Sequence, residues 1–252
     1  MDLQLEGGKA LVTGGSKGIG RAIAEALAAE GCHVAVCARN QQEIDAAVKS
    51  LSGKGVTAIG RSVDVGDGDA LKAWVKESAE ELGGIDCMVC NVSGGNAPGE
   101  EGWRANFEHD ILGTVRCVES ALPYLEESDN ASILMISSTA ALEKFIRAGA
   151  YNAMKAALLN YSGALAQDLG PRGIRVNAIS PGPIMIEGGA WDRIKQNMKE
   201  FHDQTVAQIP LGRMGTAGEV AAQAVLLASP LGAFTTGANM VIDGGITKRI
   251  QY

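Results

Sequence analysis

Short apolar segments recur along the whole chain and alternate with longer segments of helical periodicity. Between the first two short segments, Ile19, Ile23 and Leu27 are four residues apart, so they share one face of a predicted helix. The short segments are rich in β-branched and aliphatic residues, which predicts strands at Lys9–Thr13, His33–Ala38, Val56–Asp64, Ile85–Asn91, Ser132–Ser137, Ile174–Ile179 and Met240–Asp243.

Apolar strands that each lead into a helix are typical of a parallel sheet covered on both faces. The alternation continues to the end of the chain without a Pro- or Ser-rich linker. The pattern therefore predicts one doubly wound α/β domain over residues 1–252, with about seven parallel strands. In such a sheet, ligands bind outside the carboxyl ends of the strands, so the residues that follow each strand are the first candidates for chemistry.

Composition and charge narrow the classes of partner. The net charge of -7 argues against a nucleic-acid partner, because phosphate binding needs a basic surface. No apolar run approaches the ~18 residues needed to cross a bilayer. The segment Met1–Gln4 lacks the basic flank of a signal peptide. We therefore expect a soluble, cytoplasmic protein with no membrane partner.

The cysteines are odd in number and lie mostly in apolar runs, which indicates reduced, buried thiols at Cys32, Cys37, Cys87, Cys90 and Cys117. Cys87 and Cys90 have the spacing of a redox or zinc pair. They lie inside a strand-like run, however, with no second pair and no histidine nearby. The histidines are scattered without metal-ligand spacing, at His33, His109 and His202. No metal site is predicted.

A glycine-rich segment, Thr13-Gly-Gly-Ser-Lys-Gly-Ile-Gly20, joins the first predicted strand to the first helix. Glycines let the backbone turn sharply and approach a ligand closely. The helix that follows offers unpaired N–H groups and the positive end of its dipole to a pyrophosphate. A turn without a ligand is the alternative, but this position between strand and helix favours a dinucleotide site. The candidates are Gly14, Ser16, Lys17, Gly18, Ile19 and Gly20.

The end of the second strand bears on the choice between NADP and NAD. A protein that prefers NAD usually has an acidic residue there, but no acid occurs at positions 37–40. Arg39 instead offers a planar fork suited to a 2′-phosphate, and Lys17 is expected to reach the same group. NADP(H) is therefore favoured, with NAD(H) as the alternative. Asp64 and Val65, which close the third strand, are candidates for the adenine, although an aspartate there is commonly only a turn former.

Five motifs occur in order along the chain and resemble those of the short-chain dehydrogenase/reductase family from end to end. They are the glycine loop, Ser138, the Tyr151-x-x-x-Lys155 pair, Pro181-Gly-Pro-Ile184 and Asp243-Gly-Gly245. The resemblance implies a Rossmann fold, hydride transfer between NADP(H) and a carbonyl or alcohol substrate, and a homo-oligomer, tetramer or dimer. Within the family, the chain is similar to members that resemble the 3-oxoacyl-thioester reductases.

The chemistry of the catalytic candidates agrees with this resemblance. Tyr151 and Lys155 are four residues apart, so both lie on one face of a helix. A free tyrosine has a pKa near ~10, and a nearby ammonium group favours its phenolate. The resemblance implies that Ser138 binds the substrate oxygen, Tyr151 exchanges the proton and Lys155 binds the nicotinamide ribose. Ser138 rather than Ser137 lies the family's thirteen residues before the tyrosine.

The resemblance also places Asn91, Pro181, Gly182 and Ile184 at the cofactor, with Tyr151 and Lys155. After the fourth strand, Cys90 and Ser93 replace the family's usual residues, so the wall beside the nicotinamide is expected to differ. Aligning Ile111-Leu-Gly-Thr114 with the family pattern puts Asp110 where a catalytic asparagine is usual. Its backbone carbonyl is expected to serve a proton relay, while its carboxylate adds negative charge near Lys155.

Substrate choice is expected to lie in residues 184–210, which resemble the family's lid. Ile186 replaces the usual threonine, which removes a candidate bond to the nicotinamide amide. The apolar side chains of this stretch indicate either an apolar substrate or packing of the lid onto the body. A different class of function, a non-catalytic dinucleotide sensor, has no need of Ser138, Tyr151 and Lys155 together.

Overall fold

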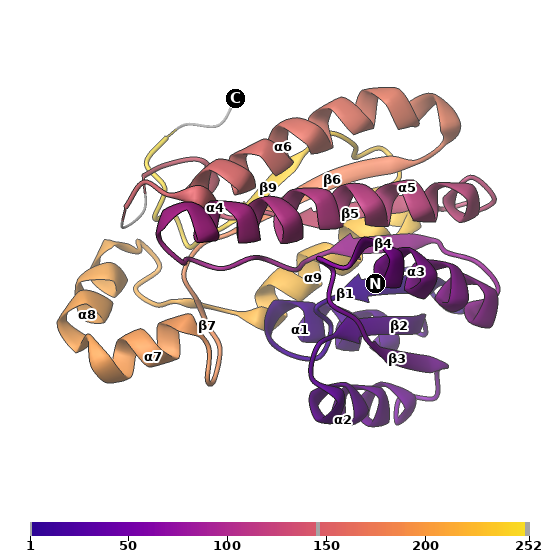
Figure 1. Cartoon of the computed structure of the whole chain (residues 1–252), viewed down its shortest axis with the longest axis horizontal. Coiled ribbons are helices and arrows are strands. Elements are labelled where there is room, and N and C mark those ends of the chain that lie inside the picture. The colour runs from indigo at the N-terminus through magenta and orange to yellow at the C-terminus, as the bar shows by residue number, and fades with distance from the viewer. Residues whose placement is uncertain (1, 145–146, 250–252) are drawn as a thin grey trace.

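Seven parallel strands form the central sheet of the computed structural model, which describes residues 2–144 and 147–249 (Figure 1). The strand order is β3-β2-β1-β4-β5-β6-β9, so the direction of winding reverses between β1 and β4. The strands are β1 (Lys9–Thr13), β2 (His33–Ala38), β3 (Ala58–Ser62), β4 (Cys87–Cys90), β5 (Ser132–Ile136), β6 (Arg175–Pro181) and β9 (Asn239–Ile242). This arrangement confirms the predicted doubly wound α/β fold. Residues 1, 145–146 and 250–252 of the predicted domain lie outside the described part.

All seven predicted strands are present, and β1 and β2 have the predicted bounds. For other strands, pairing with the neighbouring strand determines where the strand ends. The edge strand β3 is shorter than predicted because it pairs only with the five residues Val34–Ala38 of β2. β6 runs beyond its predicted end to Pro181, which pairs with Ile242 of β9. A small two-stranded sheet, β7 (Ile184–Met185) with β8 (Gly215–Thr216), was not predicted.

Helices cover both faces of the sheet (Figure 1). Side chains of α3, α5 and α6 pack on one face, and those of α1, α2 and α9 on the other. The helices are α1 (Gly18–Ala29), α2 (Gln41–Ser52), α3 (Gly68–Leu82), α4 (Gly99–Asn106), α5 (Gly113–Leu125), α6 (Ala150–Leu169), α7 (Ala190–Asn197), α8 (Lys199–Gln208) and α9 (Ala217–Ala228). A π-helical turn joins α4 to α5 (Phe107–Leu112), and short 3-10 turns occur at Thr139–Ala141, Gly170–Arg172 and Pro230–Gly232. None of the helices in the described ranges is both long and apolar enough to cross a bilayer.

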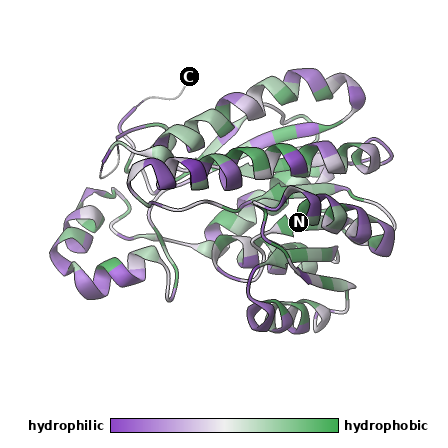
Figure 2. Ribbon diagram, viewed as in Figure 1, coloured by the Kyte–Doolittle hydropathy of each residue, from purple (hydrophilic) through white to green (hydrophobic). Residues whose placement is uncertain are grey.

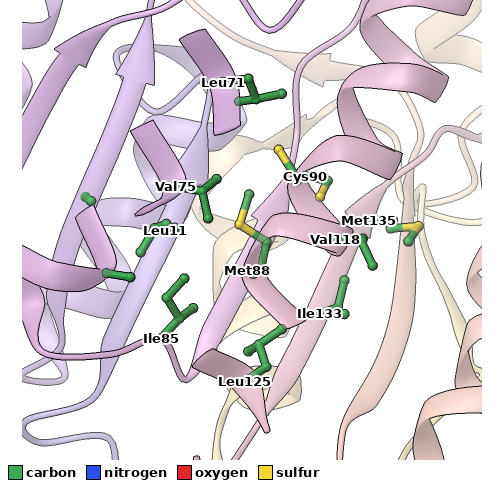
Figure 3. Close-up of a cluster of buried hydrophobic side chains, with 14 of the residues drawn as sticks. Leu11, Leu71, Val75, Ile85, Met88, Cys90, Val118, Leu125, Ile133 and Met135 are labelled. Carbon is green, nitrogen blue, oxygen red and sulfur yellow. The ribbon is translucent and has the colours of Figure 1, made fainter. Parts of the chain in front are cut away.

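The core lies between the sheet and these two layers of helices. The central strands are apolar, whereas the helices carry polar residues on their outer sides (Figure 2). On the α3–α5 face, Met88 and Ile133 of the sheet lie among Val75, Val118 and Leu125 of the helices, all at most 1% exposed (Figure 3). Burying each such side chain stabilises the fold by about 1.5–3 kcal/mol. Because this core fixes the strands, their carboxyl ends form a rigid edge for a site.

The five cysteines are all buried and unpaired, as predicted. Burial raises the pKa of Cys32 and Cys37 to about 12 and that of Cys87 to about 11. A thiol reagent such as 5,5′-dithiobis(2-nitrobenzoate) is therefore expected to leave the native protein unmodified at pH 8 and to modify five thiols after unfolding in guanidinium. Rapid modification of the native protein, followed by absorbance, would contradict this expectation.

The same pKa values predict a dependence of stability on pH. Above the ordinary thiol pKa of 9.0, the unfolded chain loses protons that the folded chain keeps. The free energy of unfolding then falls as the pH rises from 9 towards 11, by about 1.4 kcal/mol per pH unit for each such thiol. Urea unfolding of Cys37→Ala beside the natural protein measures this slope, which should be smaller in the variant.

Candidate active site

The glycine loop after β1 is held in one conformation by its neighbours. Gly14 has a positive φ of 67°, and a Cβ there would lie 2.8 Å from Asn91 Nδ2. A Cβ on Gly20 would lie 2.4 Å from the Gly14 oxygen. Asn91, just after β4, donates from Nδ2 to the Thr13 oxygen and from its backbone N–H to Thr13 Oγ1, both at 3.0 Å. Only glycine fits these positions, because a side chain at either one would collide with Asn91 or with the loop itself.

The first turn of α1 is available to an anion. Its N-cap residue, Lys17, makes no side-chain capping bond, so the first N–H groups of the helix lack that acceptor. Gly18 follows with a positive φ of 61°. The chain thus presents unpaired donors and the positive end of a helix dipole directly after β1, as the sequence predicts for a pyrophosphate site.

The residues predicted near the adenosine ribose lie around the ends of β2 and β3. Arg39 is exposed at the end of β2. Ser16 and Lys17 both contact Glu43, a residue that the sequence analysis did not single out. Val65 is buried, whereas Asp64 is exposed.

Asp64 already has hydrogen-bond partners. Its Oδ1 accepts from the Gly66 N–H at 3.0 Å and lies 3.0 Å from His109 Nε2. Although burial opposes it, the Gly66 N–H, His109 and Arg39 together lower the pKa of this carboxyl. Each of the three histidines has a hydrogen-bond partner: His33 accepts the Thr57 N–H, His109 lies against Asp64 and the Ala105 oxygen, and His202 lies against Asp203.

Ser138, Tyr151 and Lys155 line one cavity of about 940 Å³ at the carboxyl edge of the sheet. Ser138 directly follows β5, and the other two lie on the first turns of α6. The Lys155 ammonium lies 5.9 Å from the centre of the Tyr151 ring. Ser138 Oγ accepts the Ala140 N–H at 3.1 Å, so its own proton remains free for a further acceptor.

The neighbouring serine has a different place. Ser137 is 3% exposed, and its hydroxyl donates to the Lys155 backbone oxygen at 2.8 Å. This bond ties the end of β5 to α6. Asn152 adds a second tie, because its Nδ2 donates to the Ala140 oxygen at 3.1 Å. Together these bonds fix the helix that carries Tyr151 against the strand that leads to Ser138.

Asp110 is fully buried in the π-helical turn and contacts Lys155 directly. Its Oδ1 lies 2.9 Å from Lys155 Nζ, and its Oδ2 accepts the Gly94 N–H at 2.7 Å. Lys155 Nζ also donates to the Ile136 oxygen at 2.9 Å. The sequence analysis assigned a role to the Asp110 backbone carbonyl, and that oxygen accepts the Thr114 hydroxyl at 2.7 Å. The sequence analysis expected the carboxylate to add negative charge near Lys155, and in the structure the two groups are in direct contact.

The cavity continues between the body and the two helices of the predicted lid, α7 and α8. Trp191 and Phe201 stack with ring centres 6.1 Å apart, and Ile194 lines the cavity beside them. Met198 points outward and is 56% exposed. Ile186 packs on the buried cluster of α1 and α9. Apolar residues of this stretch therefore line the cavity, and Ile186 both lines it and packs on the body.

Further walls of the cavity include Pro181, Gly182 and Ile184, which the sequence analysis expected at the cofactor, and the C-terminal segment. A Cβ on Gly182 would lie 2.6 Å from Asp243 Cβ, so the two segments are in close contact. Glu143 accepts the backbone N–H groups of Lys248 and Arg249, at 2.6 and 2.7 Å. No sequence signal predicted that contact.

Comparisons with known proteins agree with this geometry. A family model described as enoyl-(acyl carrier protein) reductase matches residues 14–247. Isoepoxydon dehydrogenase of Aspergillus clavatus is 43% identical over an alignment of 254 residues, which covers 98% of this chain and 98% of the relative. A 3-oxoacyl-[acyl-carrier-protein] reductase of Staphylococcus aureus is 32% identical, over 94% of this chain and 97% of the relative.

Solved structures agree as well. L-sorbose reductase from Gluconobacter frateurii, solved with NADPH and L-sorbose, superposes with a TM-score of 0.91 at 30% identity, over 99% of this chain and 100% of that chain. The sequence identities, the coverage of the chains and the shared fold all indicate the same family. The chain belongs to the short-chain dehydrogenase/reductase family of oxidoreductases.

Proposed function

We propose that this protein is an NADP(H)-dependent oxidoreductase that acts on the carbonyl or alcohol carbon of a small substrate. The observation that carries the proposal is the shared cavity of Ser138, Tyr151 and Lys155. A hydroxyl, a phenol and an ammonium group on one wall meet the needs of carbonyl reduction, in which the oxygen must be held, protonated and stabilised. The nicotinamide, when bound, supplies or accepts the hydride.

Each catalytic side chain has a defined part in this proposal. Ser138 donates its free hydroxyl proton to the substrate oxygen and holds it beside Tyr151. Tyr151 gives its proton to that oxygen in reduction and takes it back in oxidation. Lys155 favours the phenolate of Tyr151 and remains able to bind a ribose hydroxyl. Asp110 orients the Lys155 ammonium, together with the Ile136 oxygen.

The cofactor is proposed to lie along the carboxyl edge, and the rigid glycine loop with its uncapped helix end fits a pyrophosphate. Asn91 and the segment around Gly182 would flank the nicotinamide, and Asp64 and Val65 the adenine. Arg39 and Lys17 favour the 2′-phosphate of NADP(H). L-sorbose reductase, solved with NADPH, supports this choice by analogy. Titration with NADPH and NADH tests it, and tighter binding of NADH would establish the NAD-dependent alternative.

The substrate is proposed to be a small carbonyl or alcohol compound with an apolar side. Trp191, Ile194 and Phe201 give the cavity an apolar wall, and Asn96 and Gln208 add amide groups. Relatives named for their action on isoepoxydon and L-sorbose support compounds of this size. A screen of NADPH oxidation and NADP+ reduction with aliphatic, aromatic, steroid, sugar and acyl-thioester ketones and alcohols tests the proposal. Tight NADPH binding without turnover on any of them would instead favour the sensor.

We also propose that the protein is a cytoplasmic homo-oligomer, assembled through the helices that precede and carry Tyr151. Trp103 and Phe107, one turn apart on α4 and the π-helical turn, are 46% and 47% exposed. Aromatic side chains exposed together are typical of interfaces. Light scattering is expected to give two or four times the chain mass of 26.1 kDa. A mass of one chain would refute the oligomer.

A further inference from the structure

A carboxylate of α2 contacts two candidate cofactor residues of the glycine loop, Ser16 and Lys17, of which Lys17 is expected at the 2′-phosphate. Glu43 Oε2 accepts the Ser16 hydroxyl at 3.2 Å, and Glu43 Oε1 lies 3.1 Å from Lys17 Nζ. The Ser16 residue is 7% exposed, whereas the Lys17 side chain is 76% exposed. One acidic side chain of α2 therefore engages both the hydroxyl and the ammonium group of the glycine loop.

The backbone of α2 holds Glu43 at this place. The Glu43 N–H donates to Asn40 Oδ1 at 3.1 Å, which caps the helix directly after β2. The glycine loop is tied to the same strand, because Gly14 and Gly15 donate to the Cys37 oxygen at 2.8 and 3.3 Å. The separation of Glu43 from the loop is thus set by the fold rather than by a mobile segment.

A phosphate at this site would meet both a competitor and a like charge. A phosphate monoester carries about -1.5 to -2 charges at neutral pH. The Glu43 carboxylate neutralises Lys17 and uses the Ser16 donor, so the phosphate must displace it from both. Arg39 is exposed beyond the end of β2, so its guanidinium is accessible to the phosphate. Its charge also lowers the pKa of the nearby Asp64 carboxyl.

Resting on the proposed NADP(H) function, we propose that Glu43 is a specificity-determining residue that competes with the 2′-phosphate for Ser16 and Lys17. Its carboxylate weakens the binding of NADP(H) and leaves that of NAD(H), which has no phosphate there, unchanged. The protein therefore discriminates between the two cofactors less than Arg39 and Lys17 alone would allow.

Glu43→Gln tests the proposal, because glutamine keeps the length and the acceptor oxygen but removes the charge. Isothermal titration of the whole protein with NADP+, NAD+ and adenosine 2′-monophosphate measures binding without turnover. The variant is expected to bind NADP+ and adenosine 2′-monophosphate about two- to fivefold more tightly, the range for an exposed charge pair, with NAD+ affinity unchanged. The gain should shrink in high salt.

Asp45→Asn is the matched control, since it removes the same charge from the same helix and its carboxylate contacts Gln41. It is expected to change NADP+ binding by less than about twofold. Unchanged or weaker NADP+ binding by Glu43→Gln would overturn the proposal, and weaker binding would mean that Glu43 arranges Ser16 and Lys17 for the phosphate.

Arg39→Ala separates this inference from the function on which it rests. Loss of NADP+ affinity with NAD+ unaffected would support a 2′-phosphate site, whatever Glu43 does. If Arg39→Ala leaves NADP+ binding unchanged and the natural protein binds NAD+ more tightly, the NADP(H) assignment fails. If Arg39→Ala behaves as expected but Glu43→Gln does not gain, only the role of Glu43 fails.

Discussion

Replacing Tyr151 by phenylalanine is expected to lower kcat by about a hundred- to ten-thousand-fold, with NADPH binding within about twofold of the natural protein. The phenylalanine ring fills the same space beside Lys155 but carries no proton to exchange. Ser138 can still hold the substrate oxygen, so binding should persist while proton transfer is lost. Steady-state kinetics on a substrate from the screen and a separate NADPH titration measure the two effects.

Tyr161→Phe provides the matched control, because it removes a hydroxyl from the same helix, α6, away from the cavity. Burial raises the pKa of Tyr161 to about 12, as expected for a phenol packed against the core. This variant should keep kcat within about twofold. Equal losses in the two variants would mean that the α6 hydroxyls act on stability, and undiminished turnover by Tyr151→Phe would remove Tyr151 from the mechanism.

The strands, the glycine loop and the Tyr-Lys pair could be predicted because each depends on residues close together in the chain. β1 and β2 each contain a short apolar run directly after a polar residue, Lys9 or His33, so composition marks where they begin. Gly14 follows β1 and Gly20 lies in the first turn of α1, so both belong to one short segment that joins a strand to a helix. The order of the strands in the sheet follows from the family resemblance rather than from any one segment.

The contacts of the charged side chains could not be predicted, because they join distant parts of the chain. Glu143 and Lys248 are 105 residues apart, and Glu43 and Lys17 are 26 apart. A glutamate on a helix is usually solvated, so its residue type gives no sign of such a partner. Asp110 shows the same limit: its alignment indicated the position, but only the fold reveals that its carboxylate reaches Lys155.

The Asp110–Lys155 pair is buried almost completely, with side-chain exposures of 0% and 3%. Each charge of a buried ion pair is stabilised by the other, because removing one of them leaves the other buried without a counter-ion. The pair also links the segment after β4 to α6, because Asp110 accepts the Gly94 N–H with its other oxygen. Its negative charge opposes the effect of the Lys155 ammonium on Tyr151.

Asp110→Asn is therefore expected to lower the free energy of unfolding by about 3 kcal/mol, because it removes the buried counter-ion of Lys155. The second change Lys155→Met, made in the same chain, should recover part of that loss, since no buried charge then remains. Urea unfolding of the two single variants and the double variant measures this coupling. Glu80→Gln is the control, because Glu80 pairs with Lys76 on the surface, and it should lower the free energy of unfolding by at most about 0.5 kcal/mol. Additive losses of stability in the double variant would show that the Asp110 carboxylate does not pair with Lys155.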